Sequence, residues 1–207
     1  DDYGTVGAEP VRSTGKGRAY GMELMYRLAG LDRVTLSVSY TLFWSRYIDP
    51  RSGSYAPSSW DDRHLLTLIG GYAFRRNWTI GAKFRLLGGS PYTPYDADKS
   101  SLVEAWNATA RPYYDYGAYN TGRLGFFNQL DIRVDKSFYF KGWMLGIYLD
   151  IQNVLGMKYD NPDILMSTGV IDPATAGLPA DQQRYLMKRV RDRSGTILPT
   201  LGITVEF

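Results

Sequence analysis

A strict alternation of apolar and polar side chains runs from residue 33 to residue 45. The apolar and aromatic positions are Val34, Leu36, Val38, Tyr40, Leu42 and Trp44, and mostly small hydroxylic residues separate them. Side chains two residues apart share a face of a β-strand, so this strand has one apolar and one polar face. Its length is about twice that of a typical globular strand and matches the roughly 9–11 tilted residues that cross a bilayer. The pattern predicts a strand of a transmembrane β-barrel.

The average composition conceals this pattern. Of the 207 residues 44% are hydrophobic, and the mean hydropathy is -0.30, as in an ordinary soluble protein. No run approaches the roughly 18 apolar residues of a membrane-spanning helix, so a helical membrane protein is excluded. The 17 tyrosines, 5 tryptophans and 8 phenylalanines fit a barrel, which places aromatic rings at both membrane–water interfaces. The alternative is a soluble β-sandwich or a lipocalin-like barrel, which also uses aromatic residues, and composition alone would favour it.

Charge and rare residues exclude several classes of function. The absence of cysteine excludes a disulfide framework and thiolate chemistry, and the formal net charge of +3 is too small and too evenly spread to indicate nucleic acid. His64 is the only histidine, so a histidine-based triad or a multi-histidine metal site cannot form within this sequence, and we expect His64 at the rim. The first residues lack the features of an export signal, so we expect a processed protein or a piece of a longer one.

Two-residue periodicity predicts about seven strands. They lie at residues 17–28, 33–45, 63–74, 78–86, 127–138, 143–151 and 198–207. Short turns alternate with long loops at about 46–62, 88–126 and 153–195, and we expect a short helix at 180–193 in the last loop. Tight periplasmic turns and long external loops are typical of bacterial outer-membrane barrels, and residues 1–16 then form the remnant of an external loop.

The odd number of strands has a further consequence. A bacterial single-chain barrel with antiparallel neighbours needs an even number, and unpaired strand edges in lipid are very costly. The expected fold is therefore all-β: residues 17–207 form the C-terminal part of a larger transmembrane antiparallel barrel. The remainder lies upstream or in a companion chain.

Five local patterns occur along this part of the chain. They are Gly17-Arg18-Ala19-Tyr20-Gly21-Met22-Glu23-Leu24, Trp60-Asp61-Asp62-Arg63-His64, Gly88-Gly89-Ser90-Pro91-Tyr92-Thr93-Pro94, Asn128-Gln129-Leu130-Asp131-Ile132-Arg133-Val134-Asp135-Lys136 and Asp150-Ile151-Gln152-Asn153-Val154-Leu155. In this order they resemble the C-terminal barrel strands of TonB-dependent outer-membrane receptors. The resemblance implies a barrel of about 22 strands around an N-terminal plug. It also implies the bacterial outer membrane as location, and the N-terminal barrel and plug portion, a TonB-type energy coupler and outer-membrane lipid as partners.

Two sets of residues follow from strand position. The first is a polar wall that faces the lumen and the plug, made of Glu23, Arg27, Lys83, Arg85, Asp131, Arg133, Asp135 and Asp150. Alternating charges in a water-filled lumen favour ion pairs or plug contacts over acid–base catalysis. We therefore expect no catalytic residues and no cofactor, and we do not expect the protein to be an enzyme. The second set, Ile203, Val205 and Phe207, resembles the assembly signal of a last barrel strand; the alternative is an ordinary hydrophobic strand end.

The long loops carry the candidates for ligand contact. They are Trp60, Trp106, Tyr113, Tyr114, Tyr116 and Tyr119, since exposed aromatic rings offer large stacking surfaces at small entropic cost. The alternative is that these rings pack the loops onto the barrel mouth. Basic residues of the 182–193 segment could meet lipopolysaccharide or an extracellular lid lipoprotein. Asp96 and Asp98 lack most of a calcium-loop pattern and more simply belong to a solvated turn.

These expectations combine into one function and two alternatives. The chain is expected to be part of a receptor that imports a nutrient, which could be a chelate, a glycan or a peptide, across the outer membrane. A passive outer-membrane pore or an outer-membrane enzyme barrel is the first alternative, and a soluble β-rich binding protein is the second. Dependence on detergent separates the soluble protein from the others.

Overall fold

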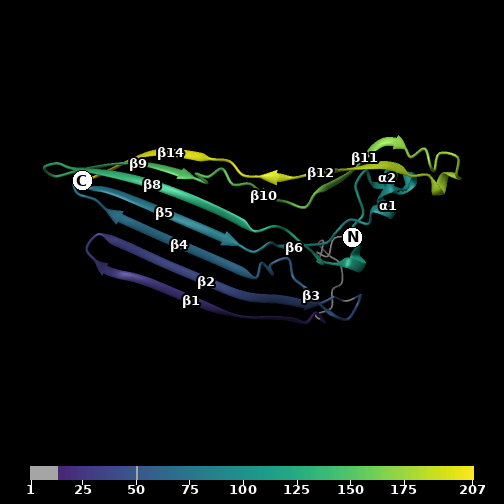
Figure 1. The fold of residues 1–207 in the computed structure, drawn as a ribbon, viewed down its shortest axis with the longest axis horizontal. Coiled ribbons are helices and arrows are strands. Elements are labelled where there is room, and N and C mark those ends of the chain that lie inside the picture. The colour runs from purple at the N-terminus through teal and green to yellow at the C-terminus, as the bar shows by residue number, and fades with distance from the viewer. Residues whose placement is uncertain (1–13, 50) are drawn as a thin grey trace.

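The computed structural model describes residues 14–49 and 51–207, so most of the expected 1–16 loop lies outside the described residues. The chain is all-β and is built on one eight-stranded antiparallel sheet in the order β1-β2-β4-β5-β8-β9-β14, with β3 paired to β2 (Figure 1). The strands are β1 (Gly17–Leu31), β2 (Val34–Ile48), β3 (Tyr55–Pro57), β4 (His64–Ala73), β5 (Trp78–Leu87), β8 (Phe127–Tyr139), β9 (Met144–Gln152) and β14 (Leu198–Glu206). The seven long strands agree with the number expected from periodicity.

The register places the apolar residues of neighbouring strands side by side. One row across the sheet consists of Tyr26, Val38, Leu68, Phe84 and Leu130, and a second consists of Val34, Tyr72, Ile80, Val134, Leu149 and Leu201. We call the face that carries these rows the apolar face and the opposite one the polar face. Cross-strand pairs of this kind are the unit of sheet stabilisation, and a slip of one residue would exchange the two faces.

Nothing covers the apolar face among the described residues. Leu165, which lies outside the main sheet, is the only buried hydrophobic residue in the part of the chain that the structure describes. By contrast, Met22, Leu24, Leu201 and Ile203 are between 62% and 72% exposed. The sheet is a single layer, and it stays open because β1 and β14 have one neighbour each and do not pair with one another.

Short turns lie at one end of the sheet and long connections at the other (Figure 1). Arg76 and Asn77 adopt φ values of 61° and 59° in the turn between β4 and β5, and Gly142 adopts 95° between β8 and β9. Such turns need residues that tolerate positive φ, and they fit the right-handed twist of the strands they join. This arrangement matches the alternation of short and long connections expected from the sequence.

The long connections have structure of their own. The one after β5 contains β6 (Pro91–Tyr92), α1 (Ala97–Ser101), α2 (Val103–Thr109), the 3-10 helix η1 (Tyr116–Ala118) and β7 (Gly122–Arg123). The one after β9 contains β10 (Tyr159–Asp160), β11 (Ile164–Ile171), the 3-10 helix η2 (Ala180–Gln182), β12 (Tyr185–Val190) and β13 (Arg193–Ser194). No helix in the described residues is long and apolar enough to cross a membrane.

The helix expected at residues 180–193 is wrong. Only η2 is helical there, and β12 pairs antiparallel with β11 over Tyr185–Val190. Most residues of β12 are good helix formers: leucine, methionine, lysine and arginine. However, this segment pairs as a strand with β11, which contains several β-branched residues. Tertiary pairing overrides helix propensity in so short a segment.

The register is open to a direct test because the chain has no cysteine. Leu145 lies opposite Val205 across β9 and β14. We expect the variant Leu145→Cys/Val205→Cys to form a disulfide on mild oxidation, seen as a mass loss of about 2 Da, because opposite Cβ atoms are close enough for an S–S bond. The control Ile147→Cys/Val205→Cys is diagonal by two residues and should oxidise far more slowly. Faster oxidation of the control would contradict the register.

Candidate functional site

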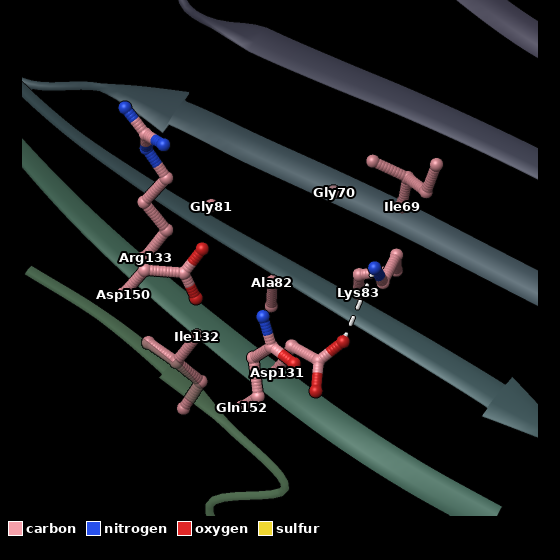
Figure 2. Close-up of a pocket in the computed structure, with 10 residues that line it drawn as sticks. All are labelled: Ile69, Gly70, Gly81, Ala82, Lys83, Asp131, Ile132, Arg133, Asp150 and Gln152. Atoms are coloured by element: carbon pink, nitrogen blue, oxygen red, sulfur yellow. Dashed lines mark ion pairs between the residues drawn. The ribbon is translucent and has the colours of Figure 1, made fainter. Parts of the chain in front are cut away.

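The polar face carries a band of charged side chains across β5, β8 and β9 (Figure 2). In the strand register Lys83 lies opposite Asp131, and Arg133 lies opposite Asp150. These four residues line a shallow pocket of about 220 Å³ together with Gln152. The residues expected in the polar wall on these three strands therefore lie together on one face of the sheet.

Asp131 is the centre of this band. It is 7% exposed, and its Oδ1 accepts hydrogen bonds from Gln129 Nε2 at 2.6 Å and from the backbone N–H of Asn153 at 2.9 Å. Its Oδ2 lies 3.2 Å from Lys83 Nζ and 3.7 Å from Arg85 Nη2. A buried carboxylate is tolerated only when it is paired and hydrogen-bonded, and here Oδ1 supplies the hydrogen bonds and Oδ2 the ion pairs.

Arg133 forms a second, more exposed pair. Its Nη2 lies 2.7 Å from Asp135 Oδ1, and its guanidinium carbon lies 3.9 Å from the centre of the Tyr148 ring. Glu23 and Arg27 do not join the band, because β1 is separated from β5 by β2 and β4, and they lie opposite Thr41 and Ser37. The polar wall thus has an ion-paired part and a separate part on the edge strand.

Asn153 connects the strand ends to the third long connection. Its side chain accepts a hydrogen bond from Met157 N at 3.0 Å and donates one to Met157 O at 2.9 Å. Its φ is 51°, a left-handed value that asparagine tolerates better than most residues. Asp131 and Asn153 belong to different sequence patterns, and the structure brings them into contact.

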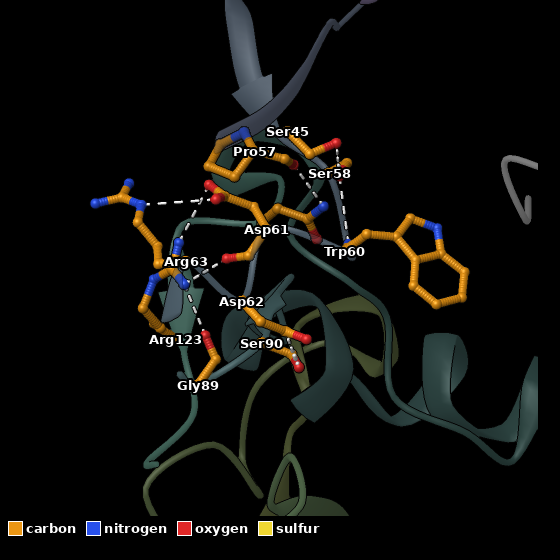
Figure 3. A network of polar contacts seen from close by, with 11 residues as sticks. Ser45, Pro57, Ser58, Trp60, Asp61, Asp62, Arg63, Gly89, Ser90 and Arg123 are labelled. Carbon is orange, nitrogen blue, oxygen red and sulfur yellow. Dashed lines mark hydrogen bonds and ion pairs between the residues drawn. The ribbon is translucent and has the colours of Figure 1, made fainter. Parts of the chain in front are cut away.

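A second network joins the first and second long connections (Figure 3). Asp61 is fully buried, and its carboxylate lies 3.6 Å from Arg63 Nε and 3.4 Å from Arg123 Nη2. Arg123 Nη1 also donates to the carbonyl oxygens of Asp61 at 2.6 Å and Gly89 at 2.7 Å. Asp62 accepts a hydrogen bond from Ser90 Oγ at 2.5 Å. These contacts hold the two connections together at the end of the sheet.

The paired glycines in this network are explained by close backbone approach. A Cβ on Gly88 would lie 1.8 Å from the carbonyl oxygen of Asp62, and one on Gly89 would lie 1.6 Å from that of Leu124. Any side chain at these positions would collide with backbone. The sequence patterns at Trp60 to His64 and Gly88 to Pro94 thus pack against each other, a contact that neither pattern predicts by itself.

Two of the expected ligand-contact residues lie in one aromatic group. The rings of Tyr114 and Tyr116 are 6.1 Å apart, Tyr95 stacks on Tyr114 at 4.9 Å, and the guanidinium of Arg51 lies 4.4 Å from the Tyr116 ring. Burial and the adjacent Tyr114 hydroxyl raise the pKa of Tyr95 to about 12, so its phenol stays protonated. Sequence reasoning missed Tyr95 and Arg51, although Tyr95 directly follows Pro94 of a quoted pattern.

The other aromatic candidates lie elsewhere. The edge of Tyr119 packs on Tyr47 at 5.8 Å. Tyr113 donates from its hydroxyl to Ala105 O at 3.2 Å, and Trp106 is half-buried on α2. Trp60 is 78% exposed beside the buried Asp61.

Several other expected residues have clear local roles. Asp96 caps α1 by accepting from Lys99 N at 2.8 Å, and the described residues contain no acidic, histidine or cysteine group suited to a metal ion. The ring of His64 accepts or donates a hydrogen bond with the Tyr40 hydroxyl at 2.8 Å at the loop end of β4. Ile203 and Val205 lie on the apolar face of β14 opposite Ile147 and Leu145, and Phe207 is fully exposed.

The burial of Asp131 predicts unequal effects of two matched substitutions. We expect Asp131→Asn to lower the free energy of unfolding by about 1–3 kcal/mol, because Lys83 and Arg85 lose their shared counter-charge. Asp135→Asn removes the same charge from a pair whose side chains are 34% and 45% exposed, and it should cost less than about 1 kcal/mol. Denaturant titration measures both; equal effects would contradict the central role of Asp131.

Comparison of the chain with protein-family models, with curated proteins and with solved structures gives no significant match. The function must therefore be argued from the chain's own geometry. Three features bear on function. They are the apolar face that no described residue covers, the ion-paired band on the polar face, and the loops that hydrogen bonds and ion pairs join at one end of the sheet.

Proposed function

We propose that the chain is the C-terminal part of the barrel of a TonB-dependent outer-membrane receptor that imports a nutrient. The observation that carries the proposal is a continuous apolar face across seven strands that no layer covers among the described residues. Soluble antiparallel sheets bury such a face against a second layer, and soluble proteins rarely expose apolar patches larger than a few hundred Å². Hydrocarbon is the environment that suits this face.

Aromatic side chains at both ends of the apolar rows support a membrane environment. At the short-turn end, Phe74, Trp78, Phe138, Phe140 and Trp143 are between 38% and 49% exposed. Near the loop end, Tyr20 stacks on Trp44 at 5.4 Å, and Tyr40 stacks on His64 at 6.2 Å. Two aromatic girdles on either side of an aliphatic band are a property of outer-membrane barrels.

The open edges of the sheet support a larger barrel. In lipid, the unpaired N–H and C=O groups along β1 and β14 would each cost several kcal/mol. Further strands from an N-terminal portion, in the same polypeptide or a companion chain, would pair with both edges. The resemblance of the five sequence patterns to TonB-dependent receptors supports about 22 strands in total, with a plug in the lumen.

The two faces then have distinct tasks. The ion-paired band around Asp131 would face the lumen and contact the plug, which a TonB-type coupler moves from the periplasm. The loop end would face outward, where the Tyr95, Tyr114 and Tyr116 rings offer stacking surface for a chelate, a glycan or a peptide. An extracellular lid lipoprotein could cover the same end.

The mass of the native assembly tests the proposal. The protein is extracted from membranes in mild detergent and weighed before and after denaturation. We expect an assembly far heavier than the 23.4 kDa of this sequence, found in the outer-membrane fraction, that includes the remaining strands and the plug. A folded, monodisperse species of that mass in buffer without detergent would refute it.

A matched pair of substitutions tests which face meets lipid. Val38 lies in the middle of β2 on the apolar face, and Ser39 follows it on the polar face. Val38→Arg should destabilise the membrane-inserted protein by about 2–4 kcal/mol, the cost of arginine at the bilayer midplane. Ser39→Arg should cost less than about 1 kcal/mol if that side chain faces a water-filled lumen. Unfolding from phospholipid vesicles measures both, and the reverse order would contradict the assignment of faces.

A further inference from the structure

Two arginines lie directly opposite one another on the apolar face at the loop end. Arg18 of β1 lies opposite Arg46 of β2, two residues along each strand from the stacked pair of Tyr20 and Trp44. The register does not shift between the two pairs. Like charges placed directly opposite each other destabilise a sheet. Arginine is also unexpected at these two positions, because each continues the series of apolar and aromatic residues along its strand.

A third guanidinium lies close to the same aromatic pair. Arg63 has a φ of 67°, a left-handed value that departs from the strand conformation, and its guanidinium lies 5.8 Å from the Trp44 ring. Arg18 lies 4.0 Å from the Tyr55 ring and 5.9 Å from the Tyr20 ring. Aromatic faces hold these cations in place without neutralising them.

The charge of Arg18 and Arg46 is not balanced by carboxylates among the described residues. Neither takes part in any ion pair in residues 14–49 and 51–207, and the buried Nε of Arg46 has no hydrogen-bond partner there. Asp61, the acid that pairs with Arg63, is fully buried between Arg63 and Arg123. Asp49 accepts from the backbone N–H groups of Arg51 and Ser52.

We propose that Arg18 and Arg46, with Arg63 beside them, form a binding site for the phosphate group of a phosphorylated glycolipid in the outer leaflet. Planar guanidinium groups bind phosphate through paired, charge-assisted hydrogen bonds, and an anion between Arg18 and Arg46 relieves their repulsion. The site lies on the apolar face, at the girdle of the loop end, so lipid reaches it from the bilayer and cargo in the lumen does not. The inference rests on the proposed membrane location of the sheet.

The test uses the complete outer-membrane assembly in detergent, titrated with lipid A and followed by native mass spectrometry. We expect Arg18→Gln/Arg46→Gln to bind lipid A at least tenfold more weakly than the wild type. The control Arg75→Gln/Arg76→Gln removes the same charge from the turn between β4 and β5 and should bind as the wild type does. Arg18→Lys/Arg46→Lys keeps the charge and should recover part of the affinity. A lipid-free assembly with the same subunit composition as the wild type, differing only by the mass of the substitutions, shows that each variant assembles.

Two further probes separate the sources of the phosphate. Dephosphorylated lipid A should bind at least tenfold more weakly than lipid A, and inorganic phosphate should compete only weakly. Equal binding of lipid A by the wild type and Arg18→Gln/Arg46→Gln overturns the site, as does equal binding of the dephosphorylated lipid. Tight binding of inorganic phosphate overturns the assignment to a lipid. Each result is read on an assembly already extracted from the outer membrane, so it is distinct from a failure of the proposed function.

Discussion

Antiparallel pairing determines the face of every side chain in the main sheet, and the rest of the structure depends on it. From β1 to β14 each strand is paired along most of its length with its neighbours. Because the side-chain period is two, a slip of one residue in β5 or β8 would turn Lys83 or Arg133 onto the apolar face. The apolar rows, the ion-paired band and the opposed arginines are all consequences of this one register.

Buried carboxylates near the strand ends connect the loops to the sheet. Asp131 accepts from the backbone of Asn153, and Asp61 attracts Arg123, whose guanidinium also binds the backbone of Gly89. A buried charge left without partners would cost several kcal/mol, so each acid favours the loop conformation that brings its partners close. Electrostatic interactions therefore order the loops at this end, whereas backbone hydrogen bonds and apolar contacts order the sheet.

Sequence reasoning recovered the strands because their signal is local and repeated. The alternation around Val38 predicts both the strand and its two faces, and the short turns are marked by residues such as Asn77 and Gly142 that tolerate positive φ. The prediction for residues 180–193 was wrong because the residues favour a helix, whereas pairing with the preceding strand β11 makes part of the segment a strand. The contact of Tyr95 with Tyr114 and that of Asp61 with Arg123 also depend on the folding of long loops, which no local pattern specifies.

Positive charges on the two faces differ in whether carboxylates balance them. On the polar face Lys83 and Arg85 share Asp131, and Arg133 has Asp135, so the band is close to neutral without any external ion. On the apolar face Arg18 and Arg46 face each other beside aromatic rings with no carboxylate among the described residues. A low-dielectric environment makes unbalanced charge more costly, so in the proposed membrane location an anion bound between Arg18 and Arg46 would stabilise this arrangement. The phosphate of an outer-leaflet lipid is the anion that we propose for this position at the boundary between hydrocarbon and water.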